Sequence, residues 1–134
     1  MTQLDTPTTK PKRKNVLTED AICINQIAPA FRFMENYKLF YPTVRWRKIA
    51  NEAYHKSVIV GAKQKRMGKK PGCGDYLLTW QGGWGWIEVK SPTGKLSPHQ
   101  KEFEKECLET GGKYSLVHNE EELWVALKQW GVLK

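Results

Sequence analysis

At positions 74–90 the chain reads GDYLLTWQGGWGWIEVK, in which a pair of glycines separates two apolar runs. We predict a β-hairpin here, because Gly82-Gly83 suits a two-residue turn whose central residues adopt positive φ. Counting back from that turn pairs Asp75 with Lys90. Paired residues share a face of the sheet and side chains alternate along a strand, so Glu88 is expected on the same face, diagonal to Asp75.

The two faces of the predicted hairpin differ in character. One carries Asp75, Glu88 and Lys90, and the other is apolar, with Tyr76, Leu78, Trp80, Ile87 and Val89. Neighbouring carboxylates repel each other unless a cation lies between them. Oxygen ligands favour Mg²⁺ or Mn²⁺ over zinc, and such a cation can activate water and polarise a phosphoryl oxygen. The alternative is a surface hairpin with a salt bridge between Asp75 and Lys90, which would stabilise the fold little.

A helix is predicted to begin within the stretch GKLSPHQ at positions 94–100. Ser97 has the features of an N-cap, with Gln100 completing a capping box. Gln100 also shares a helical stripe with Phe103 and Cys107, which places it at the edge of the helix that faces the sheet. From there its amide can reach the polar face of the hairpin. The capping role and the site role are compatible.

Together these motifs resemble the virus-type replication and repair nuclease domain (VRR-NUC) of the PD-(D/E)XK nuclease superfamily. Thr18-Glu19 opens the first helix, and a basic run at 61–75 ends in the aspartate. Glu88-Val89-Lys90 supplies the Glu-x-Lys element, and Gly94 to Gln100 supplies the last motif. Gly74 stands where the family often has proline, which changes the stiffness of the turn and not the chemistry.

The resemblance covers roughly positions 17–125 and implies a metal-dependent endonuclease that cleaves DNA phosphodiester bonds. It implies Mg²⁺ or Mn²⁺ as cofactor, branched or flapped DNA as substrate in replication, repair or recombination, and a homodimer similar to junction resolvases. Asp20 is an alternative to Glu19, and either acid could simply complement the dipole of its helix. The implied catalytic residues are Asp75, Glu88, Lys90, Gln100 and Glu19, and the implied metal ligands are Asp75, Glu88 and Val89.

The net charge of +8 indicates a polyanionic partner, because phosphate contacts by Lys and Arg supply sequence-independent affinity. We expect one basic cluster to adjoin the metal site and to contact DNA: Lys63, Lys65, Arg66, Lys69 and Lys70. Two further clusters lie at positions 10–14 and 45–48. Basic runs are often only solvated surface. Trp84 and Trp86 would either stack on bases or pack in the core.

With 134 residues, of which 40% are hydrophobic, the chain is expected to form a single domain. We predict a mixed α/β, restriction-endonuclease-like domain at positions 17–134, with a small mixed sheet flanked by helices, after a disordered basic tail at 1–16. The remaining predicted elements are a helix from Leu17 kinked at Pro29, a short extended piece at 40–43, a helix at 45–54, an ambiguous stretch at 56–68, a helix at 97–110, a strand at 114–118 and a helix from Asn119 to Trp130.

Three scattered cysteines without metal-ligand spacing suggest neither a disulfide framework nor a zinc site. A cytoplasmic location in a bacterium or a phage-infected cell is expected, since the sequence has no bilayer-spanning apolar stretch and its start is polar. The leading hypothesis is the nuclease. A non-catalytic DNA-binding adaptor is the alternative, and a sequence-specific restriction nuclease is less favoured because the chain has no room for a recognition module.

Overall fold

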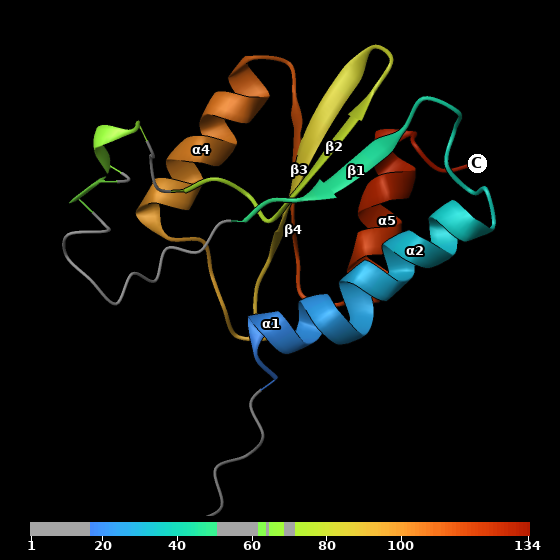
Figure 1. Cartoon of the computed structure of the whole chain (residues 1–134), viewed down its shortest axis with the longest axis horizontal. Coiled ribbons are helices and arrows are strands. Elements are labelled where there is room, and N and C mark those ends of the chain that lie inside the picture. Colours follow the sequence, from blue (N-terminus) through green and yellow to red (C-terminus); the bar gives the residue numbers. More distant parts are fainter. Residues whose placement is uncertain (1–16, 51–61, 64, 69–71) are drawn as a thin grey trace, which may run out of the picture.

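The computed structural model describes residues 17–50, 62–63, 65–68 and 72–134, so the predicted tail at 1–16 lies outside the described residues. Figure 1 shows the arrangement of the helices and strands. In chain order the elements are α1 (Glu19–Ile22), the π-helical segment η1 (Cys23–Ile27), α2 (Ala28–Asn36), β1 (Arg45–Lys48), β2 (Tyr76–Trp80), β3 (Gly83–Val89), α4 (Pro98–Glu109), β4 (Lys113–Val117) and α5 (Glu120–Trp130).

The strands form one four-stranded mixed sheet in the order β1-β2-β3-β4. The first three strands are antiparallel neighbours, and β4 runs parallel to β3. A parallel pair needs a crossover connection, which α4 provides between β3 and β4. Helix α4 covers one face of the sheet, while α2 and α5 lie on the other (Figure 1). The expected mixed α/β architecture with helices on both sides is therefore confirmed.

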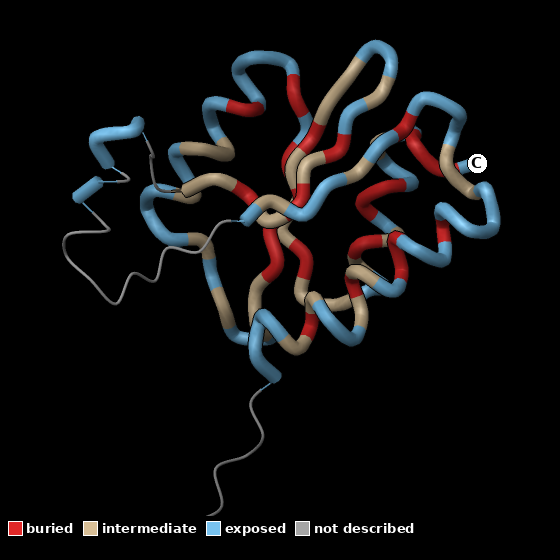
Figure 2. Tube along the Cα trace, in the orientation of Figure 1, coloured by how far each residue is buried: buried red, intermediate tan, exposed pale blue. Residues whose placement is uncertain are grey.

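The core lies between the sheet and the layer formed by α2 and α5. The apolar face predicted for the hairpin is buried there, with Tyr76, Leu78, Ile87 and Val89 all at or below 2% exposure. Figure 2 shows buried residues along the strands and along the helix faces that point toward them. Phe31 is central, because its ring stacks on Trp46 at 4.7 Å and lies 5.1 Å from the ring of Tyr76, centroid to centroid.

The helix predicted at 45–54 is wrong where the structure describes it, because Arg45–Lys48 is strand β1. Trp46 is half-buried against Phe31, and its neighbours Arg45 and Arg47 are exposed. That alternation has the period of a strand, and pairing with β2 satisfies the backbone. Residues 51–61 lie outside the described residues, and of the ambiguous stretch at 56–68 the structure describes helical turns at 62–63 and 65–66.

The hairpin is present, but its turn lies one residue earlier than predicted. Trp80 pairs with Gly83, so Gln81 and Gly82 are the turn residues. Gly82 has φ of +92° and Gln81 does not have positive φ, so the turn has the type II pattern and not the pair of positive φ values predicted for Gly82-Gly83. Gly83 belongs to the strand, and glycine is needed there because a Cβ would lie 2.4 Å from the indole nitrogen of Trp80.

The remaining helices begin and end close to the predicted positions. Ser97 and Asn119 cap α4 and α5 through their side chains, and Gly111 and Gly131 follow the two helices with positive φ. Strand β4 begins at 113, one residue before the predicted start. The disturbance expected at Pro29 takes the form of the π-helical segment that precedes it. Proline cannot donate a backbone hydrogen bond and crowds the carbonyl of the preceding turn.

Over the described part of the chain, no helix combines the length and the apolar character needed to cross a membrane.

The central position of Phe31 can be tested against Phe33, which lies on the same helix and is 48% exposed. Phe31→Ala should lower the free energy of unfolding by about 3–5 kcal/mol, because it leaves a cavity under Trp46 and Tyr76. Phe33→Ala should cost about 1 kcal/mol or less. Urea denaturation measures both, and equal losses would contradict the described core.

Candidate functional site

The candidate site lies where β2 begins and β3 ends. Asp75 directly precedes β2, and Lys90 directly follows β3. The predicted pairing of Asp75 with Lys90 is wrong, since the N–H of Asp75 donates to the carbonyl of Ile87 at 3.0 Å. The side chains still converge, because Tyr76 pairs with Ile87 where the predicted register would pair it with Val89. A shift of two residues leaves every side chain on its predicted face.

Each of the two carboxylates has one oxygen engaged by a strong hydrogen bond. The Val89 N–H donates to Oδ2 of Asp75 at 2.7 Å, and Nε2 of Gln100 donates to Oε1 of Glu88 at 2.7 Å. Oε2 of Glu88 is buried and has no hydrogen-bond partner within the described residues. A buried carboxylate oxygen without a donor is costly, so Glu88 has an unmet need for a positive or donating neighbour.

Burial and charge together make Glu88 a weak acid. Glu88 is only 3% exposed, and this burial is the largest cause of the rise of its pKa from 4.5 to about 8. The charge of Asp75 raises the pKa further, and the ammonium of Lys90, 3.6 Å from Oε1, opposes the shift. Near neutral pH the site therefore favours either a proton or a cation at Glu88.

Glu19, and not Asp20, is the helix-start acid that contacts the site. Its Oε1 lies 3.6 Å from Nζ of Lys90, which places the ammonium between Glu19 and Glu88. Thr18 fixes the start of α1 by accepting a hydrogen bond from the N–H of Ala21 at 3.1 Å. The amine is 13% exposed, whereas the Glu19 side chain is 48% exposed.

Gln100 performs both of the roles that its position predicted. Its backbone N–H donates to Oγ of Ser97, and its Oε1 accepts from the Ser97 N–H, which completes the capping box. The nitrogen of the same amide donates to Glu88. The start of α4 thus fixes the orientation of Gln100, and Gln100 in turn fixes the orientation of the buried carboxylate.

Lys48 is a site residue that the sequence analysis missed. Its Nζ lies 3.8 Å from Oδ1 of Asp75, although it was expected on a helix as part of a basic cluster. The signal was the alternation around Trp46, which identifies a strand and so places Lys48 at the strand end beside Asp75. Without the pairing of β1 with β2, nothing in the sequence relates the two residues.

The predicted DNA-binding cluster is only partly within the described residues. Lys63, Lys65 and Arg66 are exposed, while Lys69 and Lys70 lie outside the described part. Where the chain is described again, Gly72 has φ of +100°, and a Cβ there would lie 2.5 Å from the carbonyl oxygen of His99. The segment that leads to Asp75 therefore rejoins the fold against the first turn of α4.

The two tryptophans on the polar face of the hairpin serve packing. Trp86 makes an edge contact with Phe103 of α4, with ring centroids 5.4 Å apart. The ring of Trp84 lies against Gly112, where a Cβ would be 2.3 Å from it. Of the two roles considered for them, the structure favours packing over base stacking.

The donor set of the site fits a hard divalent cation. Oε2 of Glu88 has no hydrogen-bond partner in the described structure, and Oδ1 of Asp75 faces the ammonium of Lys48 at 3.8 Å. No group of three His, Cys, Asp or Glu side chains that could hold a metal occurs within the described residues. Mg²⁺ commonly binds through one or two carboxylates and completes its shell with water and substrate phosphate, so two carboxylates suffice. The main-chain contact of Val89 with the site is its N–H, which donates to Asp75, whereas a backbone ligand to a cation would be the carbonyl oxygen.

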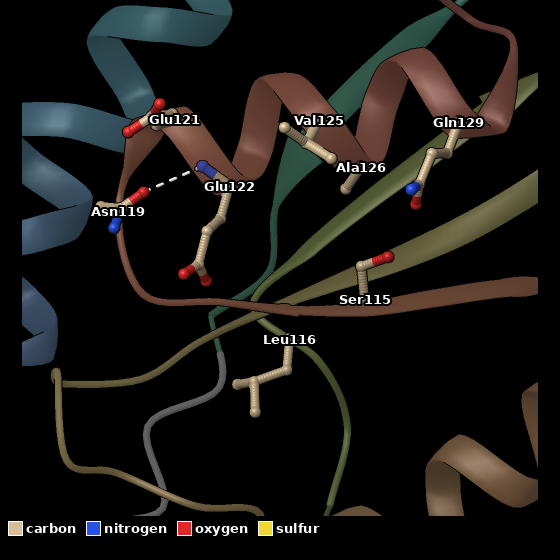
Figure 3. Close-up of a pocket in the computed structure, with 8 residues that line it drawn as sticks. All are labelled: Ser115, Leu116, Asn119, Glu121, Glu122, Val125, Ala126 and Gln129. Carbon is tan, nitrogen blue, oxygen red and sulfur yellow. Dashed lines mark hydrogen bonds between the residues drawn. The ribbon is translucent and has the colours of Figure 1, made fainter.

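A hollow of about 400 Å³ lies elsewhere, between β4 and α5 (Figure 3). Ser115 points toward the helix, and Leu116 points away from it. Glu122 lines this hollow, but its carboxylate is bound by Nδ1 of His118 at 2.9 Å. None of the site residues described above lines it.

A scan against protein-family models found no match, and neither the curated proteins nor the solved structures gave one. A nuclease function for this site is therefore a proposal that its residues and their geometry have to support.

The raised pKa of Glu88 predicts a pH-dependent stability in the absence of divalent cations. Folding raises this pKa from 4.5 to about 8. The contribution of Glu88 to the free energy of unfolding is therefore most favourable below pH 4.5, and it is lost as the pH rises through 8. Glu88→Gln removes the charge and should raise the melting temperature by a few degrees at pH 8.5 in chelator. At pH 4.5 the melting temperatures should differ little. Glu102→Gln, on the exposed side of α4, is the matched control. A pH-independent effect of Glu88→Gln would contradict this prediction.

The double role of Gln100 predicts unequal effects of two substitutions in the capping box. Ser97→Ala should lower the free energy of unfolding by about 1 kcal/mol, as for other N-caps. Gln100→Ala should cost about 1–3 kcal/mol more, because it also removes the donor to a buried carboxylate. Urea denaturation at neutral pH measures both. Equal losses would indicate that the bond to Glu88 contributes nothing to stability.

Proposed function

We propose that this protein is a divalent-metal-dependent DNA endonuclease that hydrolyses phosphodiester bonds, with preference for branched DNA. One observation carries the proposal: Asp75 lies beside the buried Glu88, whose Oε2 has no hydrogen-bond partner in the described structure, and the ammonium of Lys90 is 3.6 Å from Glu88. A structural salt bridge would not need an orphaned carboxylate oxygen beside a second acid. Metal-assisted hydrolysis does need that arrangement.

The proposed mechanism assigns a separate task to each side chain. Bound Mg²⁺ or Mn²⁺ supplies Lewis acidity at the phosphate and at the attacking water. Asp75 and Glu88 would hold the cation, with the main-chain carbonyl oxygen of Val89 as a further ligand. Lys90, whose ammonium lies 3.6 Å from Glu88, would orient the nucleophile or stabilise the charge that develops on the phosphoryl oxygens.

Two further residues position the reacting groups. The carboxylates of Glu19 and Glu88 each lie 3.6 Å from the Lys90 ammonium, so two ion pairs restrict the direction of the amine. Gln100 donates to Oε1 of Glu88 and thereby leaves Oε2 for the cation. Both contacts restrict side chains that would otherwise adopt several rotamers, which is how a site keeps a productive geometry.

The substrate class is supported by charge and by the family resemblance. The exposed basic residues Lys63, Lys65 and Arg66 belong to the segment that leads to Asp75, and the net charge of +8 favours a nucleic acid partner. Branched or flapped DNA and a homodimeric assembly follow from the resemblance to small junction-resolving nucleases.

A cleavage panel tests this proposal. The purified protein is incubated with four-way junction, flap, nicked, linear and single-stranded DNA in Mn²⁺, and we expect cleavage of at least one branched substrate. Chelator should abolish it. Lys90→Met should lower the rate by about 10²–10⁴-fold, the usual range for loss of a charge-stabilising or proton-transferring group. Lys128→Met removes an equal charge near the end of α5 and should leave the rate unchanged.

The adaptor hypothesis predicts a different result in the same samples. An adaptor would bind the junction equally well in chelator, cleave none of the substrates and show no heat on titration with Mn²⁺. Cleavage that persists in Lys90→Met would indicate a contaminating nuclease and would also reject the proposal.

A further inference from the structure

Lys48 occupies a defined position at the end of β1. Its Cα pairs with that of Tyr76, the first residue of β2. The next residue, Ile49, donates its N–H to the carbonyl of Asp75 at 2.8 Å, so a hydrogen bond joins the backbone after Lys48 to the backbone of Asp75. The ammonium also lies 5.5 Å from the centroid of the Tyr76 ring. This pairing places Lys48 on the face of Tyr76, and its long side chain brings the ammonium to Asp75 at the end of the strand.

The carboxylate oxygen that faces Lys48 is the one that the proposed cation would use. Oδ2 of Asp75 already accepts the Val89 N–H at 2.7 Å. Oδ1 faces the Lys48 ammonium at 3.8 Å, a separation too long for a hydrogen bond. Nζ of Lys48 instead donates to its own neighbour, the carbonyl of Ile49, at 2.8 Å. The contact with Asp75 is therefore an ion pair that a stronger cation can displace.

The two amines of the site differ in their freedom to move. Lys90 is 13% exposed and lies between two acids, whereas the Lys48 side chain is 46% exposed and faces one. A long, exposed ammonium can change partners at little cost, because water solvates it throughout. Once Asp75 binds a divalent cation, the exposed ammonium of Lys48 is left to pair with a phosphate of DNA bound at the site.

We propose that Lys48 is a second functional amine of the site, which neutralises Asp75 in the metal-free protein and contacts a DNA phosphate when a divalent cation is bound. This inference rests on the proposed nuclease function and adds an exchange of partners to it. The ion pair with Lys48 screens the charge of Asp75 from the neighbouring Glu88. When a cation replaces Lys48 at Asp75, the ammonium becomes able to bind a DNA phosphate, so cation binding favours DNA binding.

Metal binding without DNA tests the first half of the exchange. Mn²⁺ is titrated calorimetrically into the wild type, Lys48→Met and Lys128→Met. Lys48→Met should bind Mn²⁺ about two- to fivefold more tightly, since the cation no longer displaces an exposed ion pair. Lys128→Met should match the wild type. An affinity of Lys48→Met that equals or falls below that of the wild type would overturn the competition.

DNA binding tests the second half, in a Lys90→Met background so that the substrate stays intact. Junction affinity is measured over a range of salt concentrations, with Mn²⁺ and with chelator. With Mn²⁺, adding Lys48→Met should weaken binding severalfold and reduce the salt slope by about one, as expected for one lost phosphate contact. In chelator the same change should have little effect. Lys48→Arg keeps the charge and should restore the binding seen with Mn²⁺.

The outcomes separate this inference from the function on which it rests. If the wild type neither binds Mn²⁺ nor cleaves DNA, the nuclease proposal fails and the exchange fails with it. If the wild type does both, but Lys48→Met behaves like Lys128→Met in the two titrations, only the role of Lys48 is rejected. A DNA-binding loss of equal size with and without Mn²⁺ also rejects the exchange, because Lys48 would then contact phosphate permanently.

Discussion

The main constraint on the structure is the burial of the Glu88 carboxylate beside Asp75, which disfavours its charged form. A buried acid next to another acid is unfavourable unless donors and cations surround it, and each neighbouring element contributes one. Gln100 donates from α4, and Lys90 provides its charge from the end of β3. The arrangement makes the site a place where a proton, an amine and a metal ion compete for the same oxygens.

The order of the sheet explains how residues distant in sequence meet there. One end of the sheet holds the last residues of β1 and β3 and the first residue of β2. Lys48, Asp75 and Lys90 therefore come together, although they span more than forty positions of the chain. The crossover through α4 then returns the chain to β4 beside β3. The antiparallel hairpin supplies the acids, and the parallel crossover supplies the helix that holds one of them in place.

Sequence reasoning predicted the local features and missed those that depend on distant pairing. The hairpin faces, both roles of Gln100 and the ends of α4 and α5 follow from alternation and capping, which neighbouring residues determine. The turn lies one residue earlier than predicted, because Gln81-Gly82 and Gly82-Gly83 both offer a glycine to a two-residue turn and the local sequence does not distinguish them. Strand β1 differs from the predicted helix, because its one half-buried side chain, Trp46, is recognisable only when Phe31 is known to stack on it.

The π-helical segment has a consequence for the phase of the first helix. A π turn holds one residue more than an α turn, and one residue corresponds to about 100° of rotation around the helix axis. The side chains before Cys23 are therefore rotated relative to those of α2, whose inner side is fixed by Phe31 and Met34 in the core. With that angular offset, one continuous helix buries Ile22 in its first turn and Phe31 in its second half, and still aims Glu19 at Lys90.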